Sequence, residues 1–262
     1  MKPIKRLGQN FLTDKNITTK ILTEFNALKE NIVVEIGPGT GALTVDLFNS
    51  CNNFYAVEID PRAVEELKVK IPNLNIINKD FIKFDLSEIY QKHNQKLRII
   101  GNIPYYLTSS IVFKMFEDHT IISDSLFMVQ LEVAKRFTAQ MGTKDYSILT
   151  ILLNYFTDTK ICFKVSKNCF FPIPKIDSAI VHLHFKDLSN DGVNPETFIK
   201  VVKAAFGNRR KTLKNSLSNS MFKEVNFEGF EFDFTKRAEQ LQLTDFINLT
   251  KYIQEVYYGR NN

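Results

Sequence analysis

The 262-residue sequence has no tryptophan, only three cysteines and only four histidines. The cysteines, Cys51, Cys162 and Cys169, are odd in number and form no Cys-x-x-Cys pair, so a disulfide framework is excluded and free thiols in a reducing compartment are expected. Among the histidines only His182 and His184 lie close together, as alternate residues of one apolar stretch. The sequence suggests no third ligand near them, so we expect a solvated strand face and no metal site there.

Long hydrophobic runs are also missing. The strongest one, residues 148–153, is far too short to cross a bilayer. Residues 1–8 carry charge but lack the apolar core of a signal peptide. The composition, 44% hydrophobic and 24% charged, is that of an ordinary globular protein, and the length suits one large domain and a smaller one. We therefore expect a soluble, cytoplasmic protein with no membrane partner.

The net charge of +5 is unevenly distributed along the chain. Residues 1–20 and residues 200–262 each carry a net charge of +4, whereas residues 21–199 carry −3. Basic ends and a nearly neutral centre indicate a polyanion that is held from two sides of a catalytic body. The alternative is ordinary solubilising charge, which a net charge of this size also allows.

Strand and helix patterns alternate over the first two thirds of the chain. Short apolar and β-branched runs predict strands, and amphipathic stretches that follow Thr or Asp caps predict helices. The expected strands are 31–36, 53–58, 74–77, 97–101 and 125–129, and the expected helices are 13–26, 42–48, one that begins at 60, and 108–116. This alternation predicts an α/β fold with a mostly parallel sheet that is covered on both faces.

The pattern changes after Gly142. Residues 146–155 are expected to form a buried helix. Residues 160–165 and 176–185 are expected to form two strands at an antiparallel edge of the sheet.

A linker is expected at residues 187–195, which are rich in Asp, Asn, Ser, Gly and Pro. Only helical patterns follow it, from residue 196 to about residue 257. We therefore divide the chain into a first domain, 1–186, and a small all-helical second domain, 187–262.

A glycine-rich loop follows the first expected strand. Residues 37–41, with the sequence Gly-Pro-Gly-Thr-Gly, let the chain turn tightly and bring its backbone close to a ligand. Because the loop also satisfies Gly-x-Gly-x-x-Ala, a dinucleotide site is a genuine competitor. Glu35, two residues before the first glycine, would repel a pyrophosphate but suits an amino-acid ammonium.

Two further carboxylates follow strands. Glu58 ends the second expected strand, where it can accept hydrogen bonds from two ribose hydroxyls, a role that fits NAD or S-adenosylmethionine. Asp80 follows the third strand and is placed to accept from an adenine amino group while Phe81 borders the ring. Taken alone, Asp80 is more simply interpreted as a surface turn residue.

Asn102-Ile103-Pro104-Tyr105 is the most informative motif. It follows the apolar stretch 97–101, so an amide, a rigid proline and an aromatic ring come where a strand ends, which is where open α/β sheets bind ligands. An amide beside a stacking ring suits a flat base with an exocyclic amino group. The motif contains no carboxylate or histidine for proton abstraction. The alternative is a turn that only caps the sheet edge.

With several further motifs, these residues resemble the ribosomal RNA adenine N6,N6-dimethyltransferases of the small-subunit type. The resemblance covers nearly the whole chain, and the ordered set of motifs is specific although each is weak alone. The set comprises residues 8–12, 35–41, Glu58, Asp80, 102–105, 129–130, 132–134, 170–178 and 209–213. The departures are small: Leu131 stands where the family often has lysine, and Gly207-Asn208 where Ser-Gln is common.

The resemblance implies a Rossmann-like class I methyltransferase sheet in residues 1–186 and a helical RNA-binding domain in residues 187–262. It implies dimethylation of two adjacent adenosines near the 3′ end of small-subunit rRNA, on an immature small subunit during ribosome biogenesis, by a cytoplasmic monomer. S-adenosyl-L-methionine would be the methyl donor and S-adenosyl-L-homocysteine the product, with no metal.

The resemblance also implies two sets of site residues. The implied cofactor-binding residues are Asn10, Leu12, Gly37, Gly39, Glu58, Asp80 and Asn102. The implied catalytic residues are Asn102, Pro104, Tyr105 and Phe170.

The expected mechanism relies on alignment rather than on a general base. The Asn102 side-chain oxygen and a backbone carbonyl of Ile103-Pro104 would accept the amino hydrogens of the adenine. Tyr105 would stack on one face of the base and Phe170 on the other, and such stacking contributes about 1–3 kcal/mol per base. The target base must leave its stack or come from an unpaired loop.

The expected helical domain contains a basic segment, residues 208–215. Its expected RNA-binding residues are Arg209, Arg210, Lys211 and Lys214, and the expected core residues around it are Ala205, Phe206, Leu213 and Leu217. A second basic cluster comprises Lys2, Lys5 and Arg6. We therefore expect RNA binding that weakens steeply with salt, against the alternative of a solvated helix face.

Three other functions stay open. A related methyltransferase, which modifies one adenosine of large-subunit rRNA and confers antibiotic resistance, shares the tetrad, but residues 209–213 and the glycines at 37–39 favour the small-subunit type. A non-catalytic ribosome-assembly factor would keep the same fold for docking. An NAD-dependent oxidoreductase is the remaining alternative.

Overall fold

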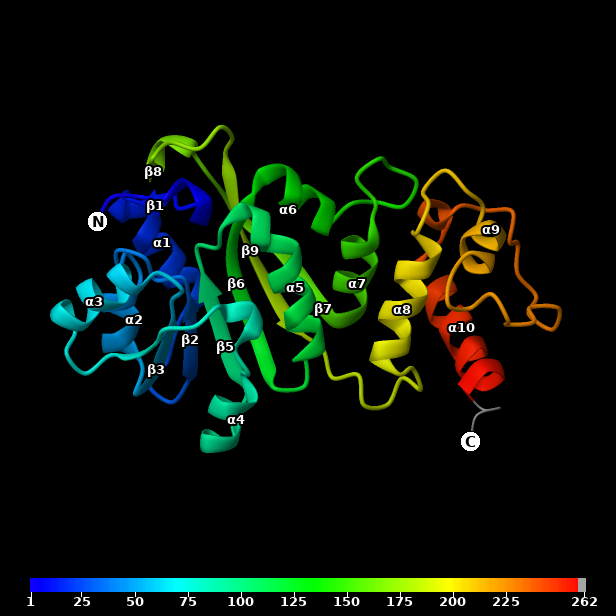
Figure 1. The fold of residues 1–262 in the computed structure, drawn as a ribbon, viewed down its shortest axis with the longest axis horizontal. Helices are drawn as coiled ribbons and strands as arrows, with labels where there is room; N and C mark the ends of the chain where they lie inside the picture. The colour runs from blue at the N-terminus through cyan, green and yellow to red at the C-terminus, as the bar shows by residue number, and fades with distance from the viewer. Residues whose placement is uncertain (259–262) are drawn as a thin grey trace. The chain divides into compact units, whose positions relative to one another are not determined.

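The structure, a computed structural model, describes residues 1–258 (Figure 1). It divides into two compact units, of which the first comprises residues 1–134 and 158–185. The second comprises residues 135–157 and the chain from residue 186 onward. This division differs from the expected boundary after residue 186, because residues 135–157 group with the second unit.

No described helix is long and apolar enough to span a membrane.

The first unit contains a seven-stranded sheet (Figure 1). Its strands are β2 (Ile32–Ile36), β3 (Asn53–Val57), β4 (Asn75–Ile77), β5 (Leu97–Gly101), β6 (Ile122–Gln130), β7 (Thr157–Val165) and β9 (Ser178–Phe185). Their order is β4-β3-β2-β5-β6-β9-β7. The pairs from β4 to β6 are parallel and β6 pairs with β9 antiparallel, so the expected mostly parallel sheet with an antiparallel edge is confirmed.

The strand order reverses at β2, which pairs with β3 on one side and β5 on the other. Ile36 lies opposite Val57 and Gly101, so the carboxyl ends of the three strands are level. A Cβ added at Gly101 would lie 2.8 Å from the Ile36 carbonyl oxygen, so this close pairing requires glycine. Such a reversal leaves a crevice at the carboxyl ends of the strands, where ligands bind.

The helices of the first unit follow the caps in the sequence. They are α1 (Lys15–Phe25), α2 (Thr44–Ser50), α3 (Pro61–Lys70), α4 (Ser87–His93) and α5 (Thr108–Glu117), while α6 (Leu131–Phe137) spans the change of unit. Asp14 accepts from the N–H groups of Asn16 and Ile17, and Asp60 caps α3 with Pro61 in its first turn, as expected.

Some elements were not expected from the sequence. Helix α4 is one, and the two-stranded sheet of β1 (Phe11–Leu12) and β8 (Phe170–Phe171) is another. The remaining short helices are η1 (Lys5–Leu7), η2 (Phe81–Lys83), η3 (Tyr105–Leu107), η4 (Lys167–Cys169), η5 (Ala238–Gln240) and η6 (Gln254–Tyr258). Such short pieces carry too little periodicity for the sequence to reveal them.

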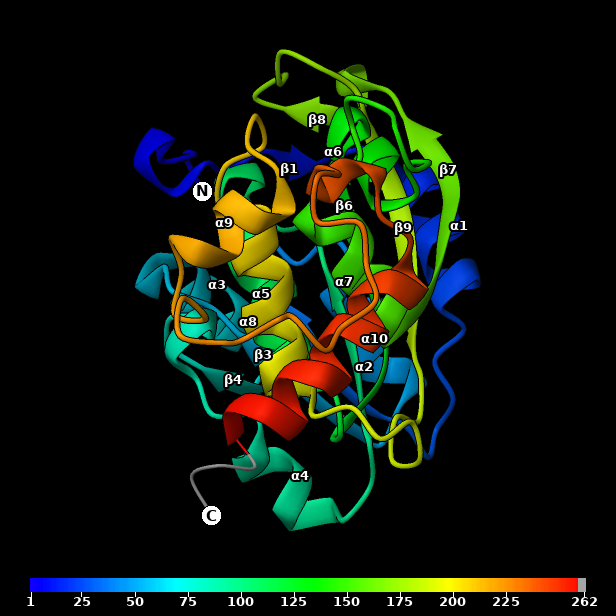
Figure 2. The same ribbon diagram turned by 90° about the vertical axis from the view of Figure 1, so that its right-hand side faces the viewer.

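The second unit is built from helices (Figure 2). They are α7 (Ile148–Phe156), α8 (Pro195–Ala205), α9 (Leu213–Ser218) and α10 (Leu243–Ile253). Tyr155 of α7 stacks on Phe198 of α8 with ring centroids 4.0 Å apart, which is why α7 belongs to this unit. The expectation of helices alone after residue 196 is wrong for residues 219–237, which form turns and loops.

Candidate active site

A cavity of about 340 Å³ opens at the carboxyl ends of β2, β3, β4 and β5. Its volume is typical of a small-molecule site, and it lies where the strand order reverses. All the residues expected to bind the cofactor line it: Asn10, Leu12, Gly37, Gly39, Glu58, Asp80 and Asn102. Pro104 and Tyr105 line it as well. The sequence-based site is therefore assembled at one place by the sheet.

The glycine loop forms one wall of the cavity. Gly37 and Gly39 have φ angles of 62° and 56°, which residues with a side chain rarely adopt. A Cβ at Gly39 would lie 3.1 Å from the Phe11 ring, whereas a Cβ at Gly37 would meet no atom within 4 Å. The first glycine thus leaves open space for a ligand, and the second allows close packing against β1.

Glu58 sits at the end of β3 and is 5% exposed. Its carboxylate oxygens accept from the backbone N–H groups of Asp60 at 2.8 Å and Gly39 at 3.1 Å. Burial raises the pKa of Glu58, and these two backbone hydrogen bonds oppose the shift. Each oxygen has a second lone pair, so the side chain can accept from two ribose hydroxyls while the loop holds it in place.

Asp80 follows β4 and is half-buried. It caps η2 by accepting from the Ile82 N–H at 3.0 Å. Asp80 and Phe81 both line the cavity, so the two residues border the same space.

Glu35 is the most unusual group at the cavity. It lies within β2, lines the cavity and is only 2% exposed. Burial, with a smaller contribution from the neighbouring Glu58 carboxylate, raises the pKa of Glu35 to about 8, although the nearby Thr44 hydroxyl opposes the rise. Its Oε2 has no hydrogen-bond partner among the described residues. A buried, unpartnered carboxylate oxygen is satisfied by an ammonium, so the donor set fits the amino-acid end of S-adenosylmethionine.

Asn102 directly follows β5, and its Nδ2 donates to the Asn10 carbonyl oxygen at 3.0 Å. Because a carbonyl can only accept, this bond fixes the orientation of the amide. The Asn102 Oδ1 is thereby left as an acceptor on a side chain that lines the cavity. This is the acceptor that the expected mechanism requires.

Tyr105 begins η3 and has its hydroxyl 2.7 Å from Ser178 Oγ. Burial raises the pKa of the Tyr105 phenol, so the ring remains neutral at physiological pH. The contact with Ser178 of β9 fixes one edge of the ring. Two aromatic residues that the sequence analysis did not assign to the site, Phe11 and the 61% exposed Tyr106, also line the cavity.

Phe170 lies outside the cavity lining. Its side chain is 2% exposed and belongs to the same apolar core as Leu12, which it faces across the β1–β8 pair. The adjacent Phe171 is 61% exposed. Stacking of Phe170 on a base therefore stays a prediction, and it requires the side chain to leave the core. The sequence could not show this burial because it depends on pairing with residues far away along the chain.

The basic segment belongs to the second unit. Arg209 Nη2 donates to the carbonyl oxygens of Lys144 and Tyr146 at 3.1 and 3.2 Å and pairs with Glu239 at 3.1 Å. Arg209 therefore links residues 144–146 to Glu239 within this unit. Its side chain is 46% exposed, so its expected binding to RNA stays a prediction. The sequence cannot distinguish it from its neighbours because its partners are distant.

The other basic residues of the segment are arranged as expected. Arg210, Lys211 and Lys214 are exposed, and none makes an ion pair within residues 1–258. The expected core residues beside them, Ala205, Phe206, Leu213 and Leu217, are all buried.

Comparisons with known proteins agree with this geometry. The family model described as ribosomal RNA adenine dimethylase matches residues 2–255. A curated relative, the ribosomal RNA small subunit methyltransferase A of Francisella tularensis subsp. tularensis, is 41% identical over 257 residues, which cover 96% of this chain and 98% of the relative.

Two solved structures are similar in fold. A dimethyladenosine transferase from Plasmodium falciparum has a TM-score of 0.77 and 27% identity, covering 94% of this chain and 98% of its own. The 23S rRNA methyltransferase ErmE has a TM-score of 0.67 and 25% identity, covering 94% of this chain and all of its own. The match of the family model over nearly all of the sequence, together with the site built at the strand ends, shows that this chain belongs to the ribosomal RNA adenine dimethylase family.

Proposed function

We propose that this protein dimethylates N6 of two adjacent adenosines near the 3′ end of small-subunit rRNA. The observation that carries the proposal is the Asn102 Oδ1, an acceptor on a side chain that lines the same cavity as Tyr105. The family membership supports the reaction, and the name of the Francisella relative supports the small subunit as the substrate.

The cavity residues are suited to hold S-adenosylmethionine, which when bound supplies an electrophilic methyl group on a sulfonium. Glu58 would accept from the ribose hydroxyls, and Asp80 from the adenine amino group of the cofactor. Glu35 would accept from the ammonium, which gives its unpartnered oxygen a hydrogen bond. The transfer needs no metal ion, because the leaving sulfur departs as a neutral thioether.

The target adenine is positioned by the tetrad. The amino nitrogen of adenine is a weak nucleophile because its lone pair is delocalised into the ring. Acceptors at Asn102 Oδ1 and at a backbone carbonyl of Ile103-Pro104 favour a pyramidal nitrogen and hold its lone pair toward the methyl group. Tyr105, held by Ser178, offers its ring as the stacking platform. The proton of the methylated nitrogen is lost readily, so no general base is required.

The RNA is proposed to bind through exposed cations on both units. Arg210, Lys211 and Lys214 supply them on the second unit, and Lys2, Lys5 and Arg6 precede the cavity-lining residues of the first. We assign the substrate to an immature small subunit, in which the 3′ adenosines are accessible, and the enzyme to the cytoplasm as a monomer.

The test is methyl transfer from labelled S-adenosylmethionine to purified, undermethylated ribosomal subunits. We expect incorporation into small subunits only, and nucleoside analysis should find N6,N6-dimethyladenosine. Large subunits are the second arm, because the structural similarity to a 23S rRNA methyltransferase makes them the alternative acceptor. Incorporation into large subunits alone, or into neither, would contradict the proposal.

A further inference from the structure

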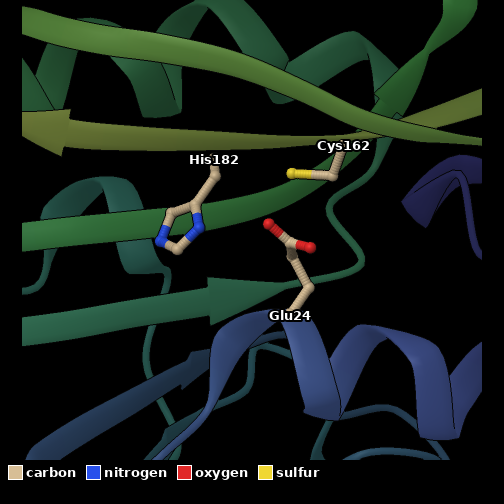
Figure 3. A group of neighbouring side chains, drawn as sticks. All are labelled: Glu24, Cys162 and His182. Atoms are coloured by element: carbon tan, nitrogen blue, oxygen red, sulfur yellow. The ribbon is translucent and has the colours of Figure 1, made fainter.

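A cluster of three potential metal ligands lies in the first unit, apart from the cavity residues (Figure 3). Glu24 comes from α1, Cys162 from β7 and His182 from β9. One ligand atom of each lies within 4.8 Å of those of the other two. Glu24 thus lies close to two residues that are more than a hundred positions further along the chain and stand on neighbouring strands.

His182 is oriented as metal-ligating histidines usually are. It is 4% exposed, so the expected solvated strand face is wrong for this histidine, because its ring packs beside Asp124 with Nε2 2.7 Å from Asp124 Oδ2. Because the carboxylate accepts, Nε2 carries the proton and Nδ1 keeps its lone pair. Figure 3 shows the ring with Nδ1 directed toward the Glu24 carboxylate and the Cys162 sulfur.

Asp124 is an orienting residue rather than a ligand. Arg98 Nε and Nη2 donate to its two oxygens at 2.7 and 2.8 Å, so the carboxylate is already neutralised. The positive guanidinium would repel a cation placed at Asp124. Asp124 contacts Nε2 of His182, whereas Glu24 and Cys162 lie toward Nδ1, the other nitrogen of the ring (Figure 3). Burial raises the pKa of the Cys162 thiol to about 12, and the nearby Glu24 carboxylate raises it too, so the thiol stays protonated until a cation displaces its proton. The backbone N–H of His182 donates to the sulfur and opposes this rise.

We propose that Glu24, Cys162 and His182 form a binding site for a borderline-soft divalent cation of the Zn²⁺ type. One sulfur, one imidazole nitrogen and one carboxylate oxygen are a donor set that zinc accepts and that Ca²⁺ and Mg²⁺ do not favour. Ligand atoms on one tetrahedral zinc lie about 3.3–3.8 Å apart, so small side-chain rotations close the cluster around the ion. Binding releases the thiol proton to solvent, and the fourth position is filled by water.

Lys160 competes with the cation. Its Nζ lies 2.7 Å from Glu24 Oε1, and its side chain is 62% exposed, so it can move into solvent when a metal arrives. On the same strand, Lys164 makes an equally short ion pair with Asp177 at 2.7 Å, whereas the ion-pair partner of Glu24 is Lys160. The chain therefore provides a matched pair of lysines for testing the site.

The test uses the full, untagged chain after treatment with a chelator. Co²⁺ and Zn²⁺ are added separately, and cobalt is followed by the thiolate-to-cobalt charge-transfer absorption. We expect one equivalent of cobalt with this band, and a higher melting temperature with zinc, because an ion that binds only the folded state stabilises it.

Variants assign the ligands. Cys162→Ser should abolish the band and the zinc-dependent rise in melting temperature, and Glu24→Gln should weaken binding at least about tenfold. Cys169→Ser, which removes a half-buried cysteine outside the cluster, should change neither. Lys160→Met should tighten binding, while Lys164→Met should leave it unchanged.

The proposal is overturned if wild-type protein gives no band, if Cys162→Ser keeps it, or if Cys169→Ser removes it. Equal effects of the two lysine substitutions would also overturn it, because binding would then reflect general surface charge. Methyl transfer is not part of the readout, so failure of this site and failure of the proposed function are separate outcomes.

Discussion

Asn102 is the residue on which the proposed chemistry depends most. Replacing it with alanine removes the acceptor for the adenine amino group and the hydrogen bond to Asn10. We expect Asn102→Ala to lower the turnover rate by about 10²–10³-fold, the usual effect of losing one positioned polar group in an active site. Incorporation of labelled methyl groups measures the rate, and filter binding should show nearly unchanged RNA affinity. Turnover close to that of the wild type would remove Asn102 from the mechanism.

Glu35 predicts a pH dependence of stability. Burial raises its pKa in the folded state to about 8, above the ordinary value of 4.5. A carboxyl with a raised pKa favours folding while protonated, so its contribution is complete below pH 4.5 and is lost as the pH rises toward 8.

The glutamine in Glu35→Gln cannot titrate, so this variant should not lose stability in this way as the pH rises. Urea unfolding at several pH values should therefore show wild-type stability falling relative to Glu35→Gln between pH 4.5 and 8, by at most about 1.4 kcal/mol per pH unit. A difference between the two proteins that stays constant with pH would mean that Glu35 is ionised in the folded state.

Among single residues, those whose place at the cavity was predicted from the sequence come at or shortly after the ends of strands. Glu58, Asp80 and Asn102 needed only a strand pattern and the rule that ligands bind at strand ends. Phe170 depends on its pairing with Leu12 of β1, far away along the chain. Arg209 depends on Tyr146 and Glu239, which are 63 and 30 positions away. No local pattern indicates such partners.

Among the elements, the loop between β2 and α2 is the most sensitive to substitution. Gly37→Ala places a Cβ in the open space of the cavity and forces alanine into a left-handed conformation, which costs about 1–2 kcal/mol. Gly142 has a φ of 80° and equally open surroundings but lies in the second unit, away from the cavity lining.

Gly142→Ala is therefore a matched control for backbone strain. Thermal unfolding should show similar destabilisation of both variants, while calorimetric titration should show weaker S-adenosylmethionine binding for Gly37→Ala alone. If both variants bind the cofactor as the wild type does, the loop does not contact it.

The turn that precedes α9 and the first turn of that helix combine two roles in neighbouring residues. Substituting Arg210, Lys211 and Lys214 together with glutamine removes three exposed cations without touching the core. If each contacts one phosphate, the slope of log affinity against log salt should become about three units shallower.

Arg209→Gln should act differently, since it removes hydrogen bonds to two carbonyl oxygens and an ion pair with Glu239. We expect about 1 kcal/mol of destabilisation and little change in the salt slope. Fluorescence titrations with small-subunit RNA at several salt concentrations, beside urea unfolding, separate the two effects. A triple variant with an unchanged slope would exclude this turn and the start of α9 from the RNA interface.

Elements with strong local signals were the ones predicted from sequence. The helices capped by Asp14 and Asp60 and the β-branched strands β2 and β3 are examples. Residues 219–237 were expected to be helical but form turns in which Phe227, Phe230 and Phe234 contact one another. Their apolar spacing resembles a helix pattern, yet side-chain clustering without a helix satisfies it equally well.

For the whole molecule, the division into units is what the sequence could not provide. The linker pattern at 187–195 correctly marks where the chain enters α8, but the second unit also takes residues 135–157 from an earlier part of the chain. Helix α7 has buried Ile151, Leu152 and Phe156, and its apolar face needs a partner that only the folded chain supplies.

A truncation tests this division. A fragment ending at residue 186 keeps α7 but loses α8, including Phe198, on which Tyr155 stacks. Each large apolar side chain left in water costs about 1.5–3 kcal/mol, so we expect the fragment to bind a hydrophobic dye and to aggregate. Co-expression with residues 187–262 returns the missing partner and should restore a soluble complex with cooperative unfolding. If the fragment 1–186 is instead monomeric, binds no dye and unfolds cooperatively alone, α7 belongs energetically with the sheet, and the boundary expected from the sequence is the physical one.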